Sequence, residues 1–198
     1  MKKGIVFLIV LVALIAFIGM KVVSTLNGMV ALDEGVKAEW SQVLNQYKRR
    51  TDLIPNLVST VKGYAAHEQQ TLQAVIEARA KATSTTVSPD MLSDAGAMQA
   101  FMDNQNALSS ALSRLMVVVE KYPDLKANQN FLALQSQLEG TENRITVARQ
   151  DYINAVRQYN TRIRTIPTSW IMAIFSDQQA KAVFEIPAAE QQAPVVSF

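Results

Sequence analysis

The chain has 198 residues, of which 49% are hydrophobic and 7% aromatic, and it contains seven glycines, six prolines and no cysteine. Sparse glycine and proline argue against a strand-and-turn architecture and favour helices, while the lack of cysteine excludes disulfides and thiolate chemistry. Three of the 19 basic residues flank an N-terminal apolar run and all 17 acidic residues lie beyond it, which leaves 16 basic against 17 acidic residues; without a basic excess, nucleic acid is not an expected partner.

An uncharged apolar run occupies residues 4–20, with Lys2 and Lys3 before it and Lys21 after it. As a helix, these 17 residues would span about 25 Å, close to the roughly 30 Å of a bilayer core, and the stem of Lys21 can extend the span. We predict an uncleaved transmembrane anchor over residues 1–25. The alternative is a cleaved signal peptide, but the run is long for one and its end offers no convincing cleavage site.

Beyond this run, apolar residues recur at alternating spacings of four and three, which is typical of a helix that packs along its length against other helices. The members of this apolar stripe are Val22, Leu26, Met29, Val36, Trp40, Val43, Tyr47, Ile54, Leu57 and Val61. Asp33 and Arg50 interrupt the stripe, and Pro55 should kink the helix without ending it. After Val61 the spacing slips by one residue and then resumes to Arg79, which predicts a local unwinding of one continuous helix.

Residues 83–90 are rich in hydroxyl side chains and include a proline, which predicts a loop. Ser93 or Asp94 can cap the next helix because their side chains can accept hydrogen bonds from its first free N–H groups. That helix carries apolar residues in three-four spacing with Gln105 as its one polar exception, and it should end just before Pro123.

A third long helix is predicted over about 124–165, and a short helix over 170–175 follows it. We therefore predict an all-α protein: a transmembrane helix that continues into an elongated antiparallel bundle of three long helices, plus a short C-terminal helix. The bundle domain should occupy residues 26–185, and 186–198 should form a disordered tail. A thin bundle buries little apolar area per residue, which favours self-association into a homo-oligomer.

No catalytic or metal-binding constellation stands out in the sequence. The single histidine, His67, is followed four residues later by Thr71, whereas a helical zinc protease needs a second histidine there. We expect no catalytic residues, no metal site and no cofactor.

Charged residues on the apolar stripes are the more informative signal, and they are Arg50, Glu68, Arg79, Glu142 and Arg149. Burial of an unpaired charge is very costly, so any that are buried should form ion pairs or hydrogen bonds between helices. The favoured interpretation is a structural polar layer that sets the helix register, and the alternative is a ligand site between the helices.

The short C-terminal helix has an apolar face formed by Trp170, Ile171, Ile174 and Phe175. Packing against the bundle is the simpler interpretation of this face, and contact with the membrane surface or with a partner is the alternative.

Several strings of the sequence resemble the LemA family. They are YKRRTDLIPNLV at 47–58, VKGYAAHE at 61–68, EAR at 77–79, EKYPDLKA at 120–127, ENRI at 142–145, AR at 148–149, YN at 159–160 and Pro167. The resemblance covers about residues 20–185. The chain departs from the family at two positions. It has Tyr152-Ile153 where the family usually has Tyr-Asn, and Ile166-Pro167 where the family usually has Phe-Pro.

The resemblance implies a single N-terminal membrane helix, an α-helical domain and no established catalytic activity. A related branch is associated with building magnetosome membranes, which implies a role in envelope organisation. Our first hypothesis is therefore a membrane-anchored scaffolding protein of the bacterial cell envelope, with a protein partner or other copies of itself; the alternative is an anchored ligand- or peptide-binding module. Basic residues at the N-terminus favour an exported domain on the periplasmic side of the inner membrane.

Overall fold

The structure is a computed structural model that describes residues 2–176 and 178–183. Its elements are α1 (Lys2–Tyr64), α2 (Gln69–Ser84), the 3-10 helix η1 (Pro89–Met91), α3 (Ala95–Val119), α4 (Pro123–Lys126), α5 (Gln129–Arg164) and α6 (Thr168–Phe175). Within the described residues there is no strand, so the predicted all-α class is confirmed. The predicted disordered tail, 186–198, lies outside the described residues.

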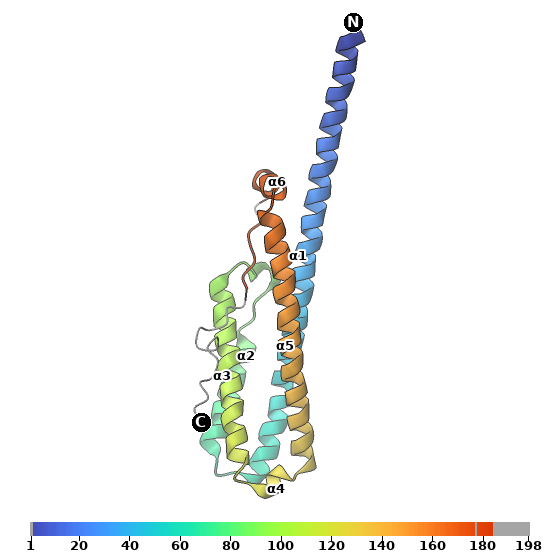
Figure 1. Cartoon of the computed structure of the whole chain (residues 1–198). Coiled ribbons are helices and arrows are strands. Elements are labelled where there is room, and N and C mark those ends of the chain that lie inside the picture. The colour runs from blue at the N-terminus through green and yellow to red at the C-terminus, as the bar shows by residue number, and fades with distance from the viewer. Residues whose placement is uncertain (1, 177, 184–198) are drawn as a thin grey trace, which may run out of the picture.

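The long helices lie side by side and alternate in direction, and α1 projects far beyond the others at its N-terminal end (Figure 1). With 63 residues, α1 is about 95 Å long. Its first part has a mean hydropathy of 2.9 over 18 residues, none of them buried against the rest of the chain, so α1 is a candidate membrane-spanning helix. The helix continues through Pro55, whose neighbours Ile54 and Leu57 are fully buried.

The prediction that one helix continues from Val61 to Arg79 is wrong. α1 ends at Tyr64, a turn follows, and α2 begins at Gln69 and packs back against α1. The slip in the apolar spacing therefore marks a chain reversal and not a local unwinding. The physical reason is burial: Leu72 and Val75 of α2 join the same apolar cluster as Val61, and a straight helix could not bring its own stripe into contact with itself. Thus a fourth helix joins the three long ones that we predicted.

Asp94 caps α3 as predicted, because its side chain accepts hydrogen bonds from the backbone N–H groups of Gly96 and Ala97. The loop predicted over 83–90 lies at residues 85–94 in the structure, between α2 and α3, and it contains η1. The third long helix starts later than expected, since residues 123–126 form the separate helix α4, and Asn128 caps α5.

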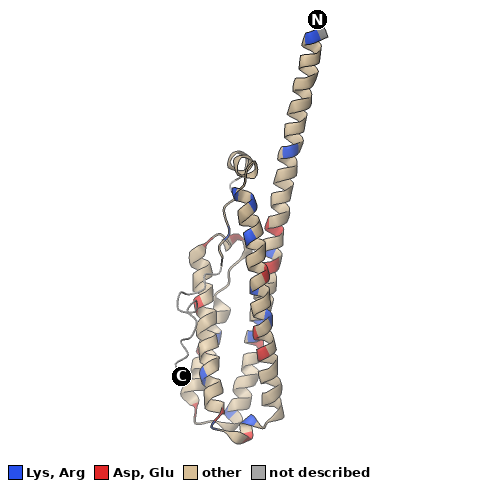
Figure 2. Cartoon of the chain, in the orientation of Figure 1, with Lys and Arg blue, Asp and Glu red and all other residues tan. Residues whose placement is uncertain are grey.

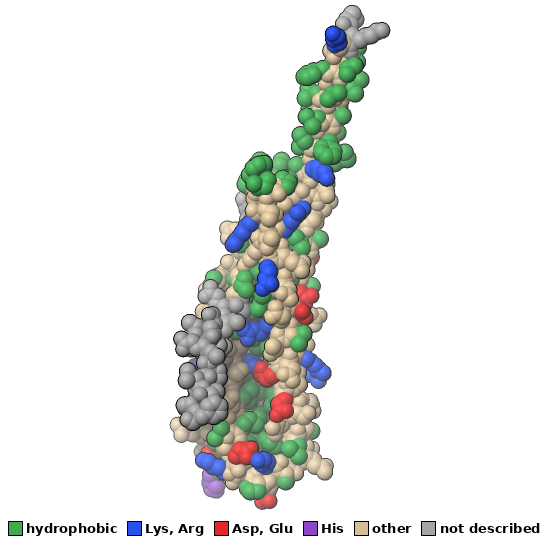
Figure 3. Space-filling model, in the orientation of Figure 1, with side chains coloured by type: hydrophobic (Ala, Val, Ile, Leu, Met, Phe, Trp, Pro, Cys, Tyr) green, Lys and Arg blue, Asp and Glu red, His purple; other side chains and the backbone are tan. Residues whose placement is uncertain are grey.

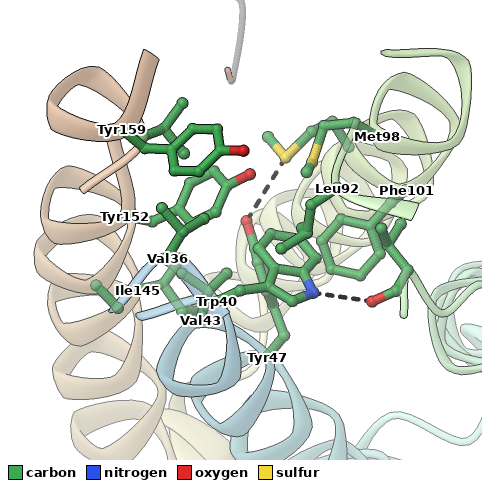
Figure 4. Packing of buried hydrophobic residues seen from close by; sticks show 14 of the residues in the cluster. Val36, Trp40, Val43, Tyr47, Leu92, Met98, Phe101, Ile145, Tyr152 and Tyr159 are labelled. Carbon is green, nitrogen blue, oxygen red and sulfur yellow. Dashed lines mark hydrogen bonds between the residues drawn. The ribbon is translucent and has the colours of Figure 1, made fainter. Parts of the chain in front are cut away.

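Two clusters of buried apolar side chains fill the bundle, and both include residues of the stripe on α1. The cluster nearer the projecting end of α1 is centred on Trp40, whose ring lies 5.4 Å from that of Phe101 on α3 and 5.2 Å from that of Tyr152 on α5 (Figure 4). The second cluster begins at Ile54 and extends to the far end of the bundle. The chain between Tyr47 and Ile54, which separates the two clusters on α1, holds the buried Arg50.

Candidate functional site: a polar layer between two apolar clusters

Arg50 is the centre of a group of interacting polar side chains that lies between the two clusters. Its side chain is 2% exposed. Nη1 donates hydrogen bonds to Glu142 Oε1 on α5 at 2.7 Å and to Ser109 Oγ on α3 at 2.9 Å. Nη2 donates to Gln105 Oε1 on α3 at 2.6 Å and to the Gln105 carbonyl at 3.3 Å. We call Arg50, Gln105, Ser109 and Glu142 the polar layer.

The polar layer connects all four long helices of the bundle. Gln105 uses its side-chain amide to donate a hydrogen bond to the Ala82 carbonyl near the end of α2, at 3.2 Å. Because Arg50 is on α1 and its partners are on α3 and α5, one network fixes the four helices at one level. A neighbouring contact adds to this, since Arg79 Nε of α2 donates to the Thr51 carbonyl of α1 at 2.8 Å.

The structure brings only some of the five predicted charges together. Arg50 and Glu142 form an ion pair, whereas Arg79 donates to the backbone carbonyl of Thr51, the residue after Arg50. Arg149 is half-buried on α5, and its charge acts on the Tyr47 hydroxyl. Glu68 lies apart from the others, at the far end of the bundle, where its carboxylate accepts a hydrogen bond from Tyr122 at 3.1 Å.

The Arg50 guanidinium is held by packing as well as by hydrogen bonds. The Arg50 guanidinium lies 5.0 Å from the centre of the Tyr47 ring, a distance at which a cation is attracted to the ring face. Burial raises the pKa of the Tyr47 hydroxyl, and the charges of Arg149 and Arg50 lower it by less. Tyr47 therefore stays neutral, and its hydroxyl donates to Met102 Sδ at 4.0 Å.

Grooves flank the polar layer on two sides. One, of about 380 Å³, is lined by residues of α3 and α5 that include Ser109, Leu112, Leu138 and Glu142. The other, of about 340 Å³, is lined by residues of α1, α2 and α3 and by part of the loop after α2. Glu142 is 46% exposed on its side of the layer, but Arg50 lines neither groove. Among the described residues, no group of three His, Asp or Glu side chains is placed to hold a metal ion.

A second polar contact, between Asp33 and Lys181, attaches the segment after α6 to the bundle. Lys181 Nζ lies 2.8 Å from Asp33 Oδ1, and both side chains are only 12% exposed. The backbone N–H of Lys181 donates to Asn160 Oδ1 at 2.8 Å, and that of Ala182 donates to the Leu92 carbonyl at 2.7 Å. The sequence did not reveal Lys181, because the segment after α6 has no periodic pattern. The signal that could have found it is Asp33, an acid on the apolar stripe that needs a cation.

The Asp33 contact predicts a specific loss of stability in acid. Burial raises the pKa of the Asp33 carboxyl, but hydrogen bonds and charges from Lys181 and Lys37 lower it more, so the pKa lies below its ordinary value. A group with a lowered pKa stabilises the fold above its unfolded-state pKa, about 4 for aspartate, and this contribution is lost as the pH falls through the folded-state pKa. Asp33→Asn should therefore lower the free energy of unfolding near neutral pH and flatten its decrease below about pH 4.

Urea unfolding of the detergent-solubilised chain at a series of pH values measures this effect. Asp52→Asn is the matched control, because Asp52 lies on the same helix and is exposed. Equal pH profiles for the two variants would contradict the role given to the Asp33–Lys181 pair.

Comparison with known proteins shows which sequences this chain resembles. The sequence profile described as the LemA family matches residues 39–198. Magnetosome protein MamQ 2 of Paramagnetospirillum magneticum is 26% identical over 180 residues, which cover 83% of this chain and 66% of that protein. MamQ of Magnetospirillum gryphiswaldense is 23% identical over the same extent, and Protein LemA of Metamycoplasma hominis is 24% identical over 124 residues, 63% of this chain and 52% of its own length. The chain thus matches just under two thirds of the length of the MamQ proteins.

Proposed function

The chain belongs to the LemA family, and from that membership we propose that it is a membrane-anchored structural protein that assembles through its long helices and catalyses no reaction. The observation that carries the proposal is the continuity of α1. One helix, Lys2–Tyr64, contains both the candidate membrane span and the first helix of the bundle. A helix without an interruption transmits position and orientation from the membrane to the far end of the bundle, which suits a spacer or scaffold.

The polar layer supports the same proposal. A buried arginine whose partners come from several helices is satisfied in only one alignment of those helices, so it selects one register at some cost in stability. Arg50 is buried beneath its partners and lines neither groove, whereas a group that acts on a substrate must be within reach of it. Neither the family description nor the names of the relatives state a catalytic activity.

The relatives support a role at a membrane. Two are named as magnetosome proteins. For this chain we propose the bacterial cytoplasmic membrane, with a cytoplasmic N-terminus and the bundle on the exported side, because Lys2 and Lys3 precede the apolar run and only Lys21 follows it closely. Copies of the chain, with or without another envelope protein, would then associate laterally along α1.

Single-cysteine crosslinking tests both assembly and sidedness, because the chain has no cysteine of its own. Cysteines introduced one at a time over residues 5–20 of α1 should form disulfide-linked dimers in intact cells with a helical period of about 3.6. Val147→Cys, on an exposed position of α5, should react with a membrane-impermeant maleimide in intact cells. Absence of dimers at every position would contradict assembly along α1, and protection of Val147→Cys would contradict the exported orientation.

The groove between α3 and α5 supports an alternative, an anchored module that binds a ligand or peptide. The groove has apolar side chains in its walls and the half-exposed Glu142 carboxylate at its edge. It would suit a ligand that is mostly apolar and carries one hydrogen-bond donor for this carboxylate. Glu142→Gln distinguishes the two functions. In a binding module this variant would lose ligand binding while its fold stays stable. In a structural layer it would lose only a little stability, because Glu142 is half-exposed, and the large loss would appear when the buried Arg50 is replaced.

A further inference from the structure

The short helix α6 lies at the end of the bundle from which α1 projects, and it crosses the direction of the long helices. In Figure 1, α6 is seen nearly end-on while α1 and α5 are seen from the side. α6 contacts both α1 and α5. If α1 crosses a bilayer along its normal, α6 therefore lies roughly parallel to the membrane plane.

α6 has one buried face and one exposed apolar face. Thr168 and Met172 are buried, and Met172 belongs to the same apolar cluster as Met29 of α1. Trp170 and Ile174 lie on the opposite side of the helix, and Phe175, two turns after Thr168 at the end of the helix, is exposed as well; the exposed fractions of the three are 63%, 74% and 60%. Of the four residues that we predicted to form the apolar face, only Ile171 is half-buried. Packing against the bundle thus uses other residues and leaves three large apolar side chains without a partner among the described residues.

This exposed face lies at the level where the exposed apolar part of α1 ends. The run of exposed large apolar side chains that starts at Ile5 ends at Val23, and the next exposed one on α1 is Val30. Met29, which shares a cluster with Met172, is six residues after Val23. Six residues of helix span about 9 Å, and a helix with its side chains is about 10–12 Å across, so the outer face of α6 reaches the level of Val23. Figure 3 shows apolar side chains gathered at this end of the bundle and along the projecting helix.

The charges near α6 match a lipid surface. α5 carries Arg157, Arg162 and Arg164 close to this end, and residues 152–176 contain no acidic side chain. On α1 the first acidic residue is Asp33. Figure 2 shows basic residues at the end of α5 next to α6, with the acidic residues further along the bundle. Arginine beside exposed tryptophan and phenylalanine is the composition of helices that lie in the headgroup region of a bilayer.

We propose that α6 is an interfacial helix, and that Trp170, Ile174 and Phe175 insert into the same bilayer that α1 crosses. At this position the side chains reach about 5–10 Å into the boundary between headgroups and acyl chains, and Arg162 and Arg164 contact anionic lipid phosphates. This adds a second membrane contact to the proposed anchor. Two contacts fix the tilt of the bundle, whereas a single helix allows it to vary.

Quenching of tryptophan fluorescence in vesicles tests the proposal with the full chain. The chain has two tryptophans, and Trp40 is fully buried and about 25 Å along α1 from Val23, beyond contact with lipid. Vesicles of phosphatidylcholine and phosphatidylglycerol with brominated acyl chains should quench most of the Trp170 emission, and aqueous iodide should quench little of it. Trp170→Phe should abolish the quenching by brominated lipid, and flotation of the vesicles checks the α1 anchor separately.

A control tryptophan is available on α5. Val147 is 60% exposed, and Val147→Trp combined with Trp170→Phe should be quenched by iodide and not by brominated lipid. Quenching of Trp170 by iodide alone would overturn the proposal, because α6 would then face water. Protection of Trp170 from both quenchers would also overturn it, because protein would then cover α6. Quenching of Trp170 by brominated lipid should weaken in the Arg162→Gln, Arg164→Gln double variant, and also when phosphatidylglycerol is omitted from the vesicles. Unchanged quenching in both cases would refute the proposed contacts between these arginines and lipid phosphates.

Discussion

Replacement of Arg50 by alanine is expected to lower the free energy of unfolding by about 3–4 kcal/mol. The substitution leaves the side chain of Gln105, which is 3% exposed, without its principal partner, and an unsatisfied buried polar group costs about 1–3 kcal/mol. The cavity left by a large buried side chain accounts for the rest. Glu142 is half-exposed, so water can solvate it and its part of the loss is small.

Urea unfolding of the detergent-solubilised chain, followed by circular dichroism, measures the effect. Arg49→Ala is the matched control, since Arg49 is the neighbouring residue on α1 and is exposed; it should change the free energy of unfolding by less than about 0.5 kcal/mol. Equal stabilities of the Arg50 and Arg49 variants would contradict a structural role for the polar layer.

A compensating pair of substitutions separates stability from alignment. Arg50→Met combined with Gln105→Leu replaces buried polar groups by apolar ones of similar size, and such replacements are often neutral or stabilising. The double variant should therefore recover at least half of the stability lost in Arg50→Ala. If the polar layer selects the helix register, the double variant should populate more than one alignment of its helices. Broadened amide signals in its NMR spectrum would reveal this.

Replacement of Trp40 by alanine is expected to cost about 3–5 kcal/mol, the largest effect of any single substitution proposed here. Trp40 is fully buried, and its Nε1 donates a hydrogen bond of 2.8 Å to the Val87 carbonyl in the loop between α2 and α3. Its ring also contacts Phe101 and Tyr152 (Figure 4). Loss of Trp40 therefore removes contacts of α1 with two helices and with a loop.

The other tryptophan provides the control for this prediction. Trp170 is exposed on α6, so Trp170→Ala should change the free energy of unfolding by less than about 0.5 kcal/mol when no membrane is present. Thermal unfolding of both variants in the same amphipol, without detergent, measures the difference. A loss of similar size in both variants would contradict the account of the core around Trp40.

The apolar stripe predicted α1 well, and the reason is local. The spacing of four and three from Val22 to Val61 depends only on helix geometry, and all its members from Met29 onward are buried. The turn after Tyr64 escaped prediction because the stripe on α2 has the same spacing as the one on α1. Spacing alone cannot tell a helix that continues from a second helix that packs back against the first.

The polar layer was only partly predictable. Arg50 and Glu142 stood out because charges are rare on an apolar stripe, and Gln105 appeared as the polar exception on α3. Ser109 gave no signal, since a serine on a helix surface is common. The pairing itself depends on which helices are neighbours and at what height, and these are tertiary facts that one sequence does not contain.

The most direct test of the proposed assembly is the mass of the protein in a membrane. Native mass spectrometry of the full chain, extracted with its surrounding lipid and without detergent, gives the number of copies in each complex. We expect complexes with at least two copies of the 21.9 kDa chain, either alone or with a further envelope protein. A single 21.9 kDa species with no partner, at every expression level tested, would contradict this expectation.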